Sequence, residues 1–310
     1  AHWLVHPNHP LTSRVTMNRW WNDLFGQPLV TTVEDFGTRG ELPTHPALLD
    51  WLSTELIKRG WSRKEMIRLI VNSATYRQAS VHRPELDERD PRNRLLARQN
   101  RFRMEAESIR DLYLAASGLL NPSIGGPSIR PPLPEGVAAL GYAGGHQWPL
   151  SEGAEKYRRG LYIFMQRTVP YPMLTTFDAP DSTTSCLRRE RSNTPLQALT
   201  LLNDPVFVEC AQALGVAGAT KYPEDLSQRL QWIFRSSVSR NPSSEEMQRL
   251  EDFYSEVRSL AEKDPAAAKD LVGDKLPTSE PANGIPVEDF VASVSVARIV
   301  LNLEEFMVRE

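Results

Sequence analysis

Apolar residues return every three or four positions along most of the chain, which is the spacing of one face of an α-helix. Between residues 46 and 60 the apolar stripe consists of Leu48, Leu49, Leu52, Leu56 and Ile57. Comparable stripes lie in residues 10–25, 62–70, 94–118, 195–202, 206–214, 225–237, 243–260 and 288–307. The pattern therefore predicts a mainly α-helical chain with roughly nine helices.

Residues that commonly open a helix precede several of these stripes. Ser62 with Glu65, and Ser243 with Glu246, have the spacing of a capping box, in which the two residues satisfy each other's free backbone N–H groups. The connection after residue 60 is so short that the helices on either side of it should pack as an antiparallel pair.

Three stretches lack the helical spacing. Residues 119–160 are rich in proline and glycine and predict a long irregular loop, and residues 161–168 have the aromatic and β-branched content of a short strand. Residues 264–287 are polar and contain four prolines, so we expect a flexible loop there. The fold class that follows is mainly α: an irregular multi-helix bundle with a long Pro/Gly-rich loop and at most a small β-hairpin. We expect one domain over 1–310, made of a helical half (10–118), an irregular loop region (119–175) and a second helical half (176–310).

The stretch from Phe177 to Asn203 joins a polar loop to the start of a helix. Its first part is rich in turn-forming residues, and a dense group of arginines follows. Thr194 is a good N-cap and Pro195 suits the first helical position. The stripe of this helix, which we expect to be buried, consists of Leu196, Leu199 and Leu202. Because helix starts carry unpaired N–H groups, chemistry or anion binding is expected at this place.

Composition narrows the function classes. A net charge of −3 argues against a general nucleic-acid binder, and no apolar run approaches the roughly 18 residues of a membrane span. The chain begins without Met and has no signal peptide, so we expect it to be a piece of a longer protein. Two cysteines, Cys186 and Cys210, are too few for a disulfide scaffold, although a single bond between them stays open.

Four residues are candidates for catalysis. Asp178 and Asp181 lie close in sequence and could act as an acid–base pair, although aspartates in such segments more commonly shape turns. Cys186 lies beside arginines, which favour a thiolate, but no nucleophile motif surrounds it. His45 ends a glycine-containing loop with several charged residues. The six histidines contain no metal-binding motif, and we predict no metal site.

Arginine and amide side chains form the most distinctive combination. The set consists of Arg14, Asn18, Arg39, Arg159, Arg167, Arg191, Gln197 and Asn203. Arginine forks match carboxylate, sulfate or phosphate, so a cleft on which they converged would bind an anionic ligand. The alternative is that they tie irregular loops to helix ends through backbone carbonyl groups.

Four segments together resemble one known family. They are HPLTSRVTMNRWWNDLFG, EDFGTRGELPTHPALLDWL, LIVNSATYRQAS and SNTPLQALTLLNDPVF. They are similar to a planctomycete and verrucomicrobial domain family of unknown function, over nearly the whole chain from about His9 to Phe306. In that family the domain usually forms the C-terminal part of large exported proteins with a planctomycete-type cytochrome c domain and a second helical domain upstream.

The resemblance implies a periplasmic or otherwise exported location and a redox-linked parent protein. The sequence has no Cys-x-x-Cys-His, so we expect no haem or other cofactor in this chain, and haem c only in an upstream domain. The expected partners are the upstream cytochrome c and helical domains and an anionic or saccharide ligand, with no nucleic acid and no membrane span.

Three hypotheses for the function follow. The first is a C-terminal module of a cytochrome c-linked protein that contributes a substrate or partner cleft in redox-linked carbohydrate metabolism. The carbohydrate part rests on the habit of the family. The second is a self-contained enzyme acting on an anionic or sugar substrate, and the third is a purely structural docking domain. The sequence leaves open whether the chain is an enzyme.

Overall fold

The computed structural model describes residues 1–134, 136–137, 148–166, 169–273 and 284–309. Contacts between residues divide the chain into two compact units. Unit 1 comprises Ala1–Phe102 and Val308–Glu310, and unit 2 comprises Arg103–Met307. The expectation of a single domain stays a prediction, because compactness alone does not show which parts fold together.

Unit 1 is built on three helices, α1 (Thr12–Phe25), α2 (Pro46–Lys58) and α3 (Arg63–Val71), followed by a 3₁₀ turn, η1 (Pro84–Leu86). Its core joins Met17 and Phe25 of α1 to Leu52 of α2 and Met66 of α3. The Asn18 side chain lies inside and holds residue Val30 by two hydrogen bonds, which fastens the loop between α1 and α2 to α1.

Unit 2 contains the remaining helices. They are α4 (Ala106–Ala116), η4 (Gly153–Tyr157), η5 (Gly160–Tyr162), α5 (Pro172–Thr176), α6 (Pro195–Asn203), α7 (Pro205–Lys221), α8 (Leu226–Val238), α9 (Ser244–Lys263), α10 (Pro265–Val272), α11 (Val287–Leu301) and α12 (Glu304–Met307). The part of the chain that the structure describes thus has twelve α-helices and one two-stranded sheet, in which β1 (Phe102–Arg103) pairs with β2 (Val308–Arg309). The predicted mainly α-helical fold is confirmed. No helix within the described ranges combines the length and apolar character needed to cross a membrane.

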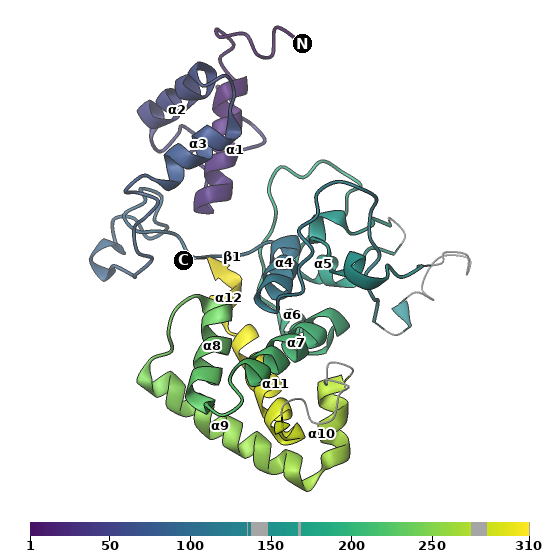
Figure 1. Cartoon of the computed structure of the whole chain (residues 1–310). Coiled ribbons are helices and arrows are strands. Elements are labelled where there is room, and N and C mark those ends of the chain that lie inside the picture. Colours follow the sequence, from purple (N-terminus) through teal and green to yellow (C-terminus); the bar gives the residue numbers. More distant parts are fainter. Residues whose placement is uncertain (135, 138–147, 167–168, 274–283, 310) are drawn as a thin grey trace. The chain divides into compact units, whose positions relative to one another are not determined.

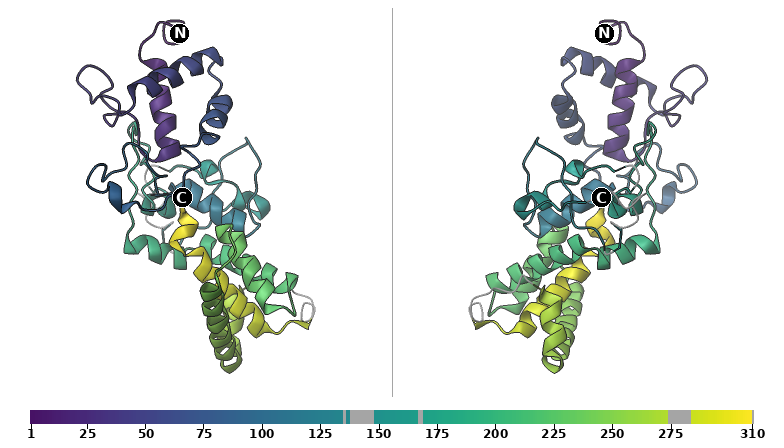
Figure 2. Two further views of the ribbon diagram at one scale, coloured as in Figure 1. Left: turned by 90° about the vertical axis from the view of Figure 1, so that its left-hand side faces the viewer. Right: turned by 90° about the vertical axis from the view of Figure 1, so that its right-hand side faces the viewer.

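Helix α11 is the centre of unit 2. It contacts α7, α8, α9 and α10, and Figures 1 and 2 show it running beside the longer α7 and α9. Ala292, Val296 and Val300 are completely buried. Because α11 is apolar over most of its circumference, it is stable only when other helices cover it from several sides.

Two buried arginines organise the irregular part of unit 2. Arg158 donates to the carbonyl oxygens of Ser123, Gly125 and Pro127, and its guanidinium lies over the ring of Tyr162. Arg110 of α4 donates to the carbonyl oxygens of Lys156 (2.8 Å) and Arg158 (3.3 Å). In a segment with no α-helix among its described residues, these side chains satisfy backbone carbonyl groups that longer secondary structure would otherwise pair.

The structure corrects the helix predicted over residues 94–118, since only Ala106–Ala116 is helical. Asn93 and Leu96 have positive φ values of 49° and 55°, which a helix cannot contain. The Asn93 amide donates to Arg98 O and Asn100 Oδ1, and the Asn100 amide donates to Phe25 O. These side-chain bonds hold the backbone in a compact turn and outcompete the helical spacing of the leucines.

A second correction concerns the flexible loop predicted over residues 264–287, because α10 occupies Pro265–Val272. Asp264 caps this helix by accepting from Ala267 N, and Pro265 stands at its first position. The three alanines of α10 supply helix propensity. Ala268 and Val272 are buried and form the face by which this helix packs.

Helix α6 forms where the sequence predicts it but faces the opposite way. The predicted inner stripe is exposed: Leu196 by 60%, Leu199 by 56% and Leu202 by 38%. Gln197 and Leu201 lie inside instead. The Gln197 Nε2 donates to Thr176 O and Ser192 Oγ, which holds this side chain in the interior while the leucines turn outward, although its Oε1 has no hydrogen-bond partner among the described residues.

The strand predicted over residues 161–168 is also corrected. Gly160–Tyr162 form a 3₁₀ turn, and Ile163 makes an isolated bridge with Ile129. Residues 167–168 lie outside the described ranges. A second isolated bridge joins Asn121 to Arg158, so the two stretches touch at separate points and their described residues form no strand there.

The contact between α7 and α11 predicts an effect of replacing Gly215 by Ala. A Cβ atom at this position would lie 2.8 Å from the carbonyl carbon of Ser293 and would also clash with the backbone of Val294. We expect Gly215→Ala to lower the free energy of unfolding by about 1–3 kcal/mol despite the better helix propensity of Ala. Chemical denaturation measures this, with Gly37→Ala as the control, since nothing lies within 4 Å of a Cβ at Gly37. Equal stability of the two variants would contradict the close helix contact.

An arginine between α8 and α9 predicts a pH dependence of stability. Arg240 contacts Glu246 (2.7 Å) and Glu305 (2.7 Å), and its bond to Glu246, together with the backbone N–H of Ser243, lowers the pKa of Glu246 from 4.5 to about 2. A depressed carboxyl pKa stabilises the fold above pH 4.5, and this stability is lost as the pH falls from 4.5 to 2. The side chains are partly exposed, so we expect Arg240→Gln to cost about 1 kcal/mol or less at pH 7. Denaturation between pH 2 and 7 should show a shallower acid loss in this variant, and an unchanged slope would contradict the coupling.

Candidate functional site

The polar loop before α6 is closed by Asp178, which has a positive φ of 60°. Its carboxylate accepts from the backbone N–H and the hydroxyl of Ser192, both at 2.7 Å. The Gln197 amide lies 3.5 Å from the same oxygen. Asp178 therefore holds the two ends of the loop together, which is a positional role for a residue that the sequence offered as a catalytic candidate.

The arginines of this loop pair with acidic residues around the start of α4. Arg189 contacts Glu107 at 2.7 Å and Glu105 at 3.2 Å, and Arg191 lies 3.7 Å from Glu105. Burial lowers the pKa of Arg189, but the hydrogen bond to Glu107 and the charges of both glutamates outweigh it, so the net pKa is raised. The positive charges of Arg189 and Arg191 are thus met by carboxylates of the same unit.

The space beside this cluster is small. The cavity lined by Arg103, Asp178, Arg191 and Gln197 has a volume of about 10 Å³. Such a space holds about one water molecule, which is too little for a phosphate, a sulfate or a sugar. In this arrangement Arg189 and Arg191 fasten the loop to the start of α4 through glutamate carboxylates, whereas the alternative interpretation expected backbone carbonyl groups.

The other candidates of unit 2 lie apart from this cluster. Arg159 pairs with Asp111 of α4 at 3.0 Å, and Asp181 accepts from Thr183 within an exposed turn. Cys186 is exposed, whereas Cys210 is completely buried, and both are free thiols. The open question of a disulfide between them is thereby answered: one cysteine belongs to the surface and the other to the core.

The candidates of unit 1 have structural partners. Arg14 contacts Asp50 at 2.7 Å, and the exposed Arg39 lies 3.7 Å from Asp35. The ring of His45 contacts the Thr44 hydroxyl at 2.9 Å just before α2, and Asn18 holds the loop described above. Arg167 lies outside the described residues. The predicted ligand set is therefore divided, with Arg14, Asn18 and Arg39 in unit 1 and Arg159, Arg191 and Gln197 in unit 2.

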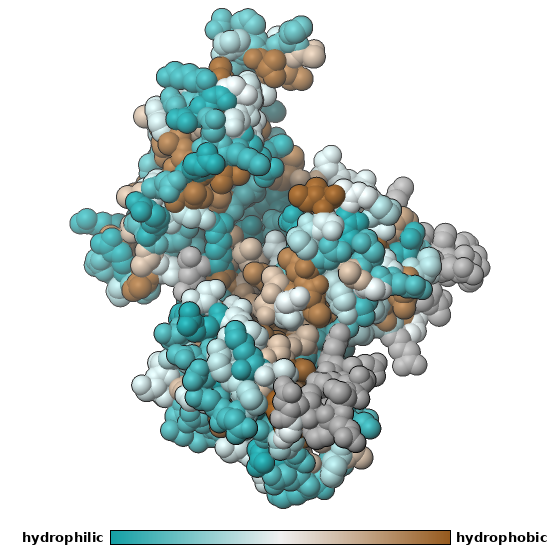
Figure 3. All heavy atoms as spheres, viewed as in Figure 1, coloured by the Kyte–Doolittle hydropathy of each residue, from teal (hydrophilic) through white to brown (hydrophobic). Residues whose placement is uncertain are grey.

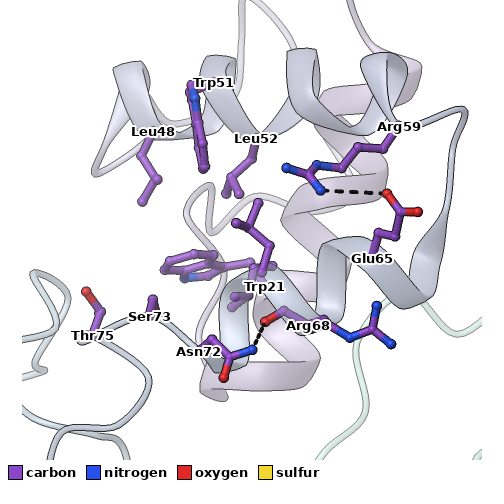
Figure 4. A pocket seen from close by; sticks show the side chains of 12 residues that line it. Trp21, Leu48, Trp51, Leu52, Arg59, Glu65, Arg68, Asn72, Ser73 and Thr75 are labelled. Atoms are coloured by element: carbon purple, nitrogen blue, oxygen red, sulfur yellow. Dashed lines mark hydrogen bonds and ion pairs between the residues drawn. The ribbon is translucent and has the colours of Figure 1, made fainter.

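Unit 1 contains a much larger pocket, which the sequence did not reveal. Its volume is about 810 Å³, and α1, α2, α3 and the turn after α3 line it. Figure 4 shows Leu48 and Trp51 projecting from α2 toward Trp21 of α1. Trp21 is buried and stacks on Phe25, whereas Trp51 is 47% exposed, so the pocket has an aromatic floor and an accessible aromatic wall. Figure 3 shows hydrophobic surface among hydrophilic surface over these helices.

Polar side chains stand at the two ends of the pocket. Arg59, Glu65 and Arg68 lie at one end in Figure 4, and Ser73 and Thr75 lie at the other. Arg59 is neutralised by Glu55 (3.2 Å) and Glu65 (3.6 Å). The guanidinium of Arg68, in contrast, makes no hydrogen bond or ion pair within the described ranges.

This arrangement offers apolar faces in the middle and hydrogen-bonding groups at the edges. The volume lies within the range of roughly 300–1,000 Å³ that is typical of small-ligand pockets. Asn72 donates to Arg68 O and leaves its own carbonyl oxygen available as an acceptor. No group of three or more His, Cys, Asp or Glu side chains suited to a metal ion occurs among the described residues.

One signal in the sequence could have pointed to the pocket. Leu48 and Trp51 are three residues apart, and Trp51 lies off the stripe of leucines that α2 buries. Together with Leu48, this aromatic residue outside the buried stripe marks the apolar surface that borders the pocket.

Comparisons with known proteins give one result. A family model described as PSD1, a protein of unknown function (DUF1553), matches residues 1–254, which end within α9. No curated protein and no solved structure matches the chain. The matched range covers unit 1 up to residue 102 and most of unit 2. The chain therefore belongs to the PSD1 (DUF1553) family of proteins of unknown function.

Proposed function

We propose that this chain is a saccharide-binding module and that the pocket of unit 1 holds a short oligosaccharide. The observation that carries the proposal is the lining of this pocket, where two indole rings face a space of about 810 Å³ with polar groups at both ends. A sugar ring has the matching character, since its C–H faces are apolar and its rim consists of hydroxyl groups.

The accessible ring of Trp51 supports this class of ligand. An indole provides a broad, rigid contact area that loses little conformational entropy when a flat partner covers it. Leu48 extends the apolar surface beside Trp51, and the buried Leu52 and Trp21 form its base. A sugar ring placed here would leave water with its apolar face while its hydroxyl groups stay at the open side.

The polar ends supply groups that orient such a ligand. The Arg68 guanidinium is a donor whose planar fork suits a hydroxyl pair or a carboxylate. The Asn72 carbonyl oxygen and the Thr75 hydroxyl add an acceptor and a group with both capacities. A few placed polar groups within a largely apolar lining are the usual composition of a specific small-ligand site.

The proposal extends to the longer protein of which this chain would be a part. The four matched motifs support an exported parent with a cytochrome c domain upstream, for which this chain would supply the cleft that holds a carbohydrate. Haem chemistry would belong to that upstream domain, because this sequence contains no Cys-x-x-Cys-His. A purified parent protein without the absorption bands of haem c would contradict this part of the proposal.

Replacing Trp51 by Ala tests the pocket directly. The side chain is half exposed on α2 and Ala favours helix, so we expect the variant to fold. Loss of the stacking surface should weaken oligosaccharide binding by about two- to tenfold. Thermal shift followed by calorimetric titration measures this with maltotriose, cellotriose, xylotriose, trigalacturonate and a chondroitin sulfate tetrasaccharide.

Trp3→Ala provides the matched control. Trp3 is 71% exposed and lies outside the pocket, so its loss should leave the affinity unchanged. Absence of binding by every saccharide in the panel would refute the proposal. Equal affinity of wild type and the Trp51→Ala variant would refute the assignment of the pocket.

A further inference from the structure

A second hollow lies on unit 2, where the end of α7 meets the outer face of α8. Its volume is about 330 Å³. The lining residues are Tyr222, Gln228, Gln231, Trp232, Arg235 and Ser236. The last five follow the spacing of one helix face, which is the face of α8 opposite the buried Leu230, Ile233 and Phe234.

Two polar groups of this hollow are available to a ligand. Within the part of the chain that the structure describes, neither the Gln231 amide nor the Arg235 guanidinium makes a hydrogen bond or ion pair. The neighbouring arginines differ: Arg229 is buried against Tyr254 and Asp289, and Arg240 is held by two glutamates. The Arg235 guanidinium thus differs from those of Arg229 and Arg240, because it lines a hollow with aromatic rings and has no partner among the described residues.

A second positive charge stands at the edge of the hollow. The Lys221 ammonium lies 4.9 Å from the centroid of the Trp232 ring and 5.6 Å from that of Tyr222. The nearby carboxylate of Asp225 is occupied, because it accepts from the backbone N–H and the side-chain amide of Gln228. A hydrogen-bonded carboxylate keeps its negative charge, but the two cations Arg235 and Lys221 outnumber it, so the net charge of these three groups is positive.

We propose that this hollow binds an acidic sugar residue, with its flat face against Tyr222 and Trp232 and its carboxylate or sulfate between Arg235 and Lys221. Planar guanidinium groups hold such anions by paired, charge-assisted hydrogen bonds. The Gln231 amide can both donate to and accept from a ring hydroxyl group. The inference does not depend on the pocket of unit 1, since its residues are separate and its ligand is defined by charge.

The chemistry of a flat ring bearing a carboxylate has two sources, a uronic acid and an aromatic acid. The lining favours the uronic acid, because Gln231 and Ser236 offer hydrogen bonds that an aromatic ring cannot use. Trigalacturonate, maltotriose and 2-naphthoate as probes separate a uronic acid, a neutral sugar and an aromatic acid.

The decisive experiment titrates the full chain with trigalacturonate by calorimetry and compares wild type with the Arg235→Gln variant. Arg235 is exposed, so the variant should keep the melting temperature of wild type. We expect the variant to bind trigalacturonate up to about tenfold more weakly than wild type does. The affinity for maltotriose should be the same for both proteins. Arg249→Gln is the matched control, since Arg249 is exposed on α9 and pairs only with Glu245 among the described residues.

Each other outcome overturns the inference. Equal affinity of trigalacturonate for wild type and the Arg235→Gln variant would show that the hollow is not its site. The same holds if Trp51→Ala alone abolishes trigalacturonate binding, a result that would support the pocket of unit 1. Tighter binding of 2-naphthoate than of trigalacturonate would refute the assignment to a sugar. Loss of acidic-sugar binding only in Arg235→Gln, with Trp51→Ala unaffected, is the result that the inference expects, and the proposed function is then tested separately by the neutral saccharides of the panel.

Discussion

The burial of α11 is the constraint on which unit 2 depends. Four helices cover this apolar segment, and the close approach of Gly215 to the backbone of Val294 lets α7 lie directly against it. Each covering helix must turn its apolar side inward, so its other side becomes surface. For α8 this leaves Gln231, Trp232 and Arg235 on one outer face. The hollow on unit 2 thus lies on the face of α8 that is left at the surface once the apolar face of this helix packs into the core.

Unit 1 meets a different limit, because three short helices enclose only a small core. Leu49, Leu52 and Leu56 of α2 lie in that core, whereas Leu48 is only partly buried and Trp51 is 47% exposed. Leu48 and Trp51 therefore border open space. Our proposal places a small ligand against this apolar lining, with its hydrogen-bonding groups at the polar ends of the pocket.

The helical fold could be predicted well because its signals are local. Capping residues such as Ser62 and Ser243 and the initial Pro195 mark the helix starts at which the structure begins α3, α9 and α6. The predictions were wrong where side-chain hydrogen bonds to other parts of the chain outweighed the local apolar pattern. Asn93 and Asn100 replaced a predicted helix with a network of side-chain bonds, and Gln197 took the interior place expected for leucines.

The candidate sites were harder to predict for a related reason. Charged and polar loops are prominent in a sequence. In this loop, however, Asp178 is bonded to Ser192 and the arginines are paired with glutamates, and the cavity beside them is too small for a ligand. Trp51 and Arg235 lie on helix faces that periodicity treats simply as solvated. Only the packing of neighbouring helices shows that these faces are hollow and that their polar groups lack partners among the described residues.

Hydrogen–deuterium exchange of the full chain tests the central claim, that the space among α1, α2 and α3 holds a saccharide, most directly. The chain would be compared with and without the oligosaccharide that gives the largest thermal shift. We expect slower amide exchange in Pro46–Lys58 and in residues 72–75, since these segments border the pocket. Unchanged exchange in both segments at a saturating concentration of the saccharide would contradict the account.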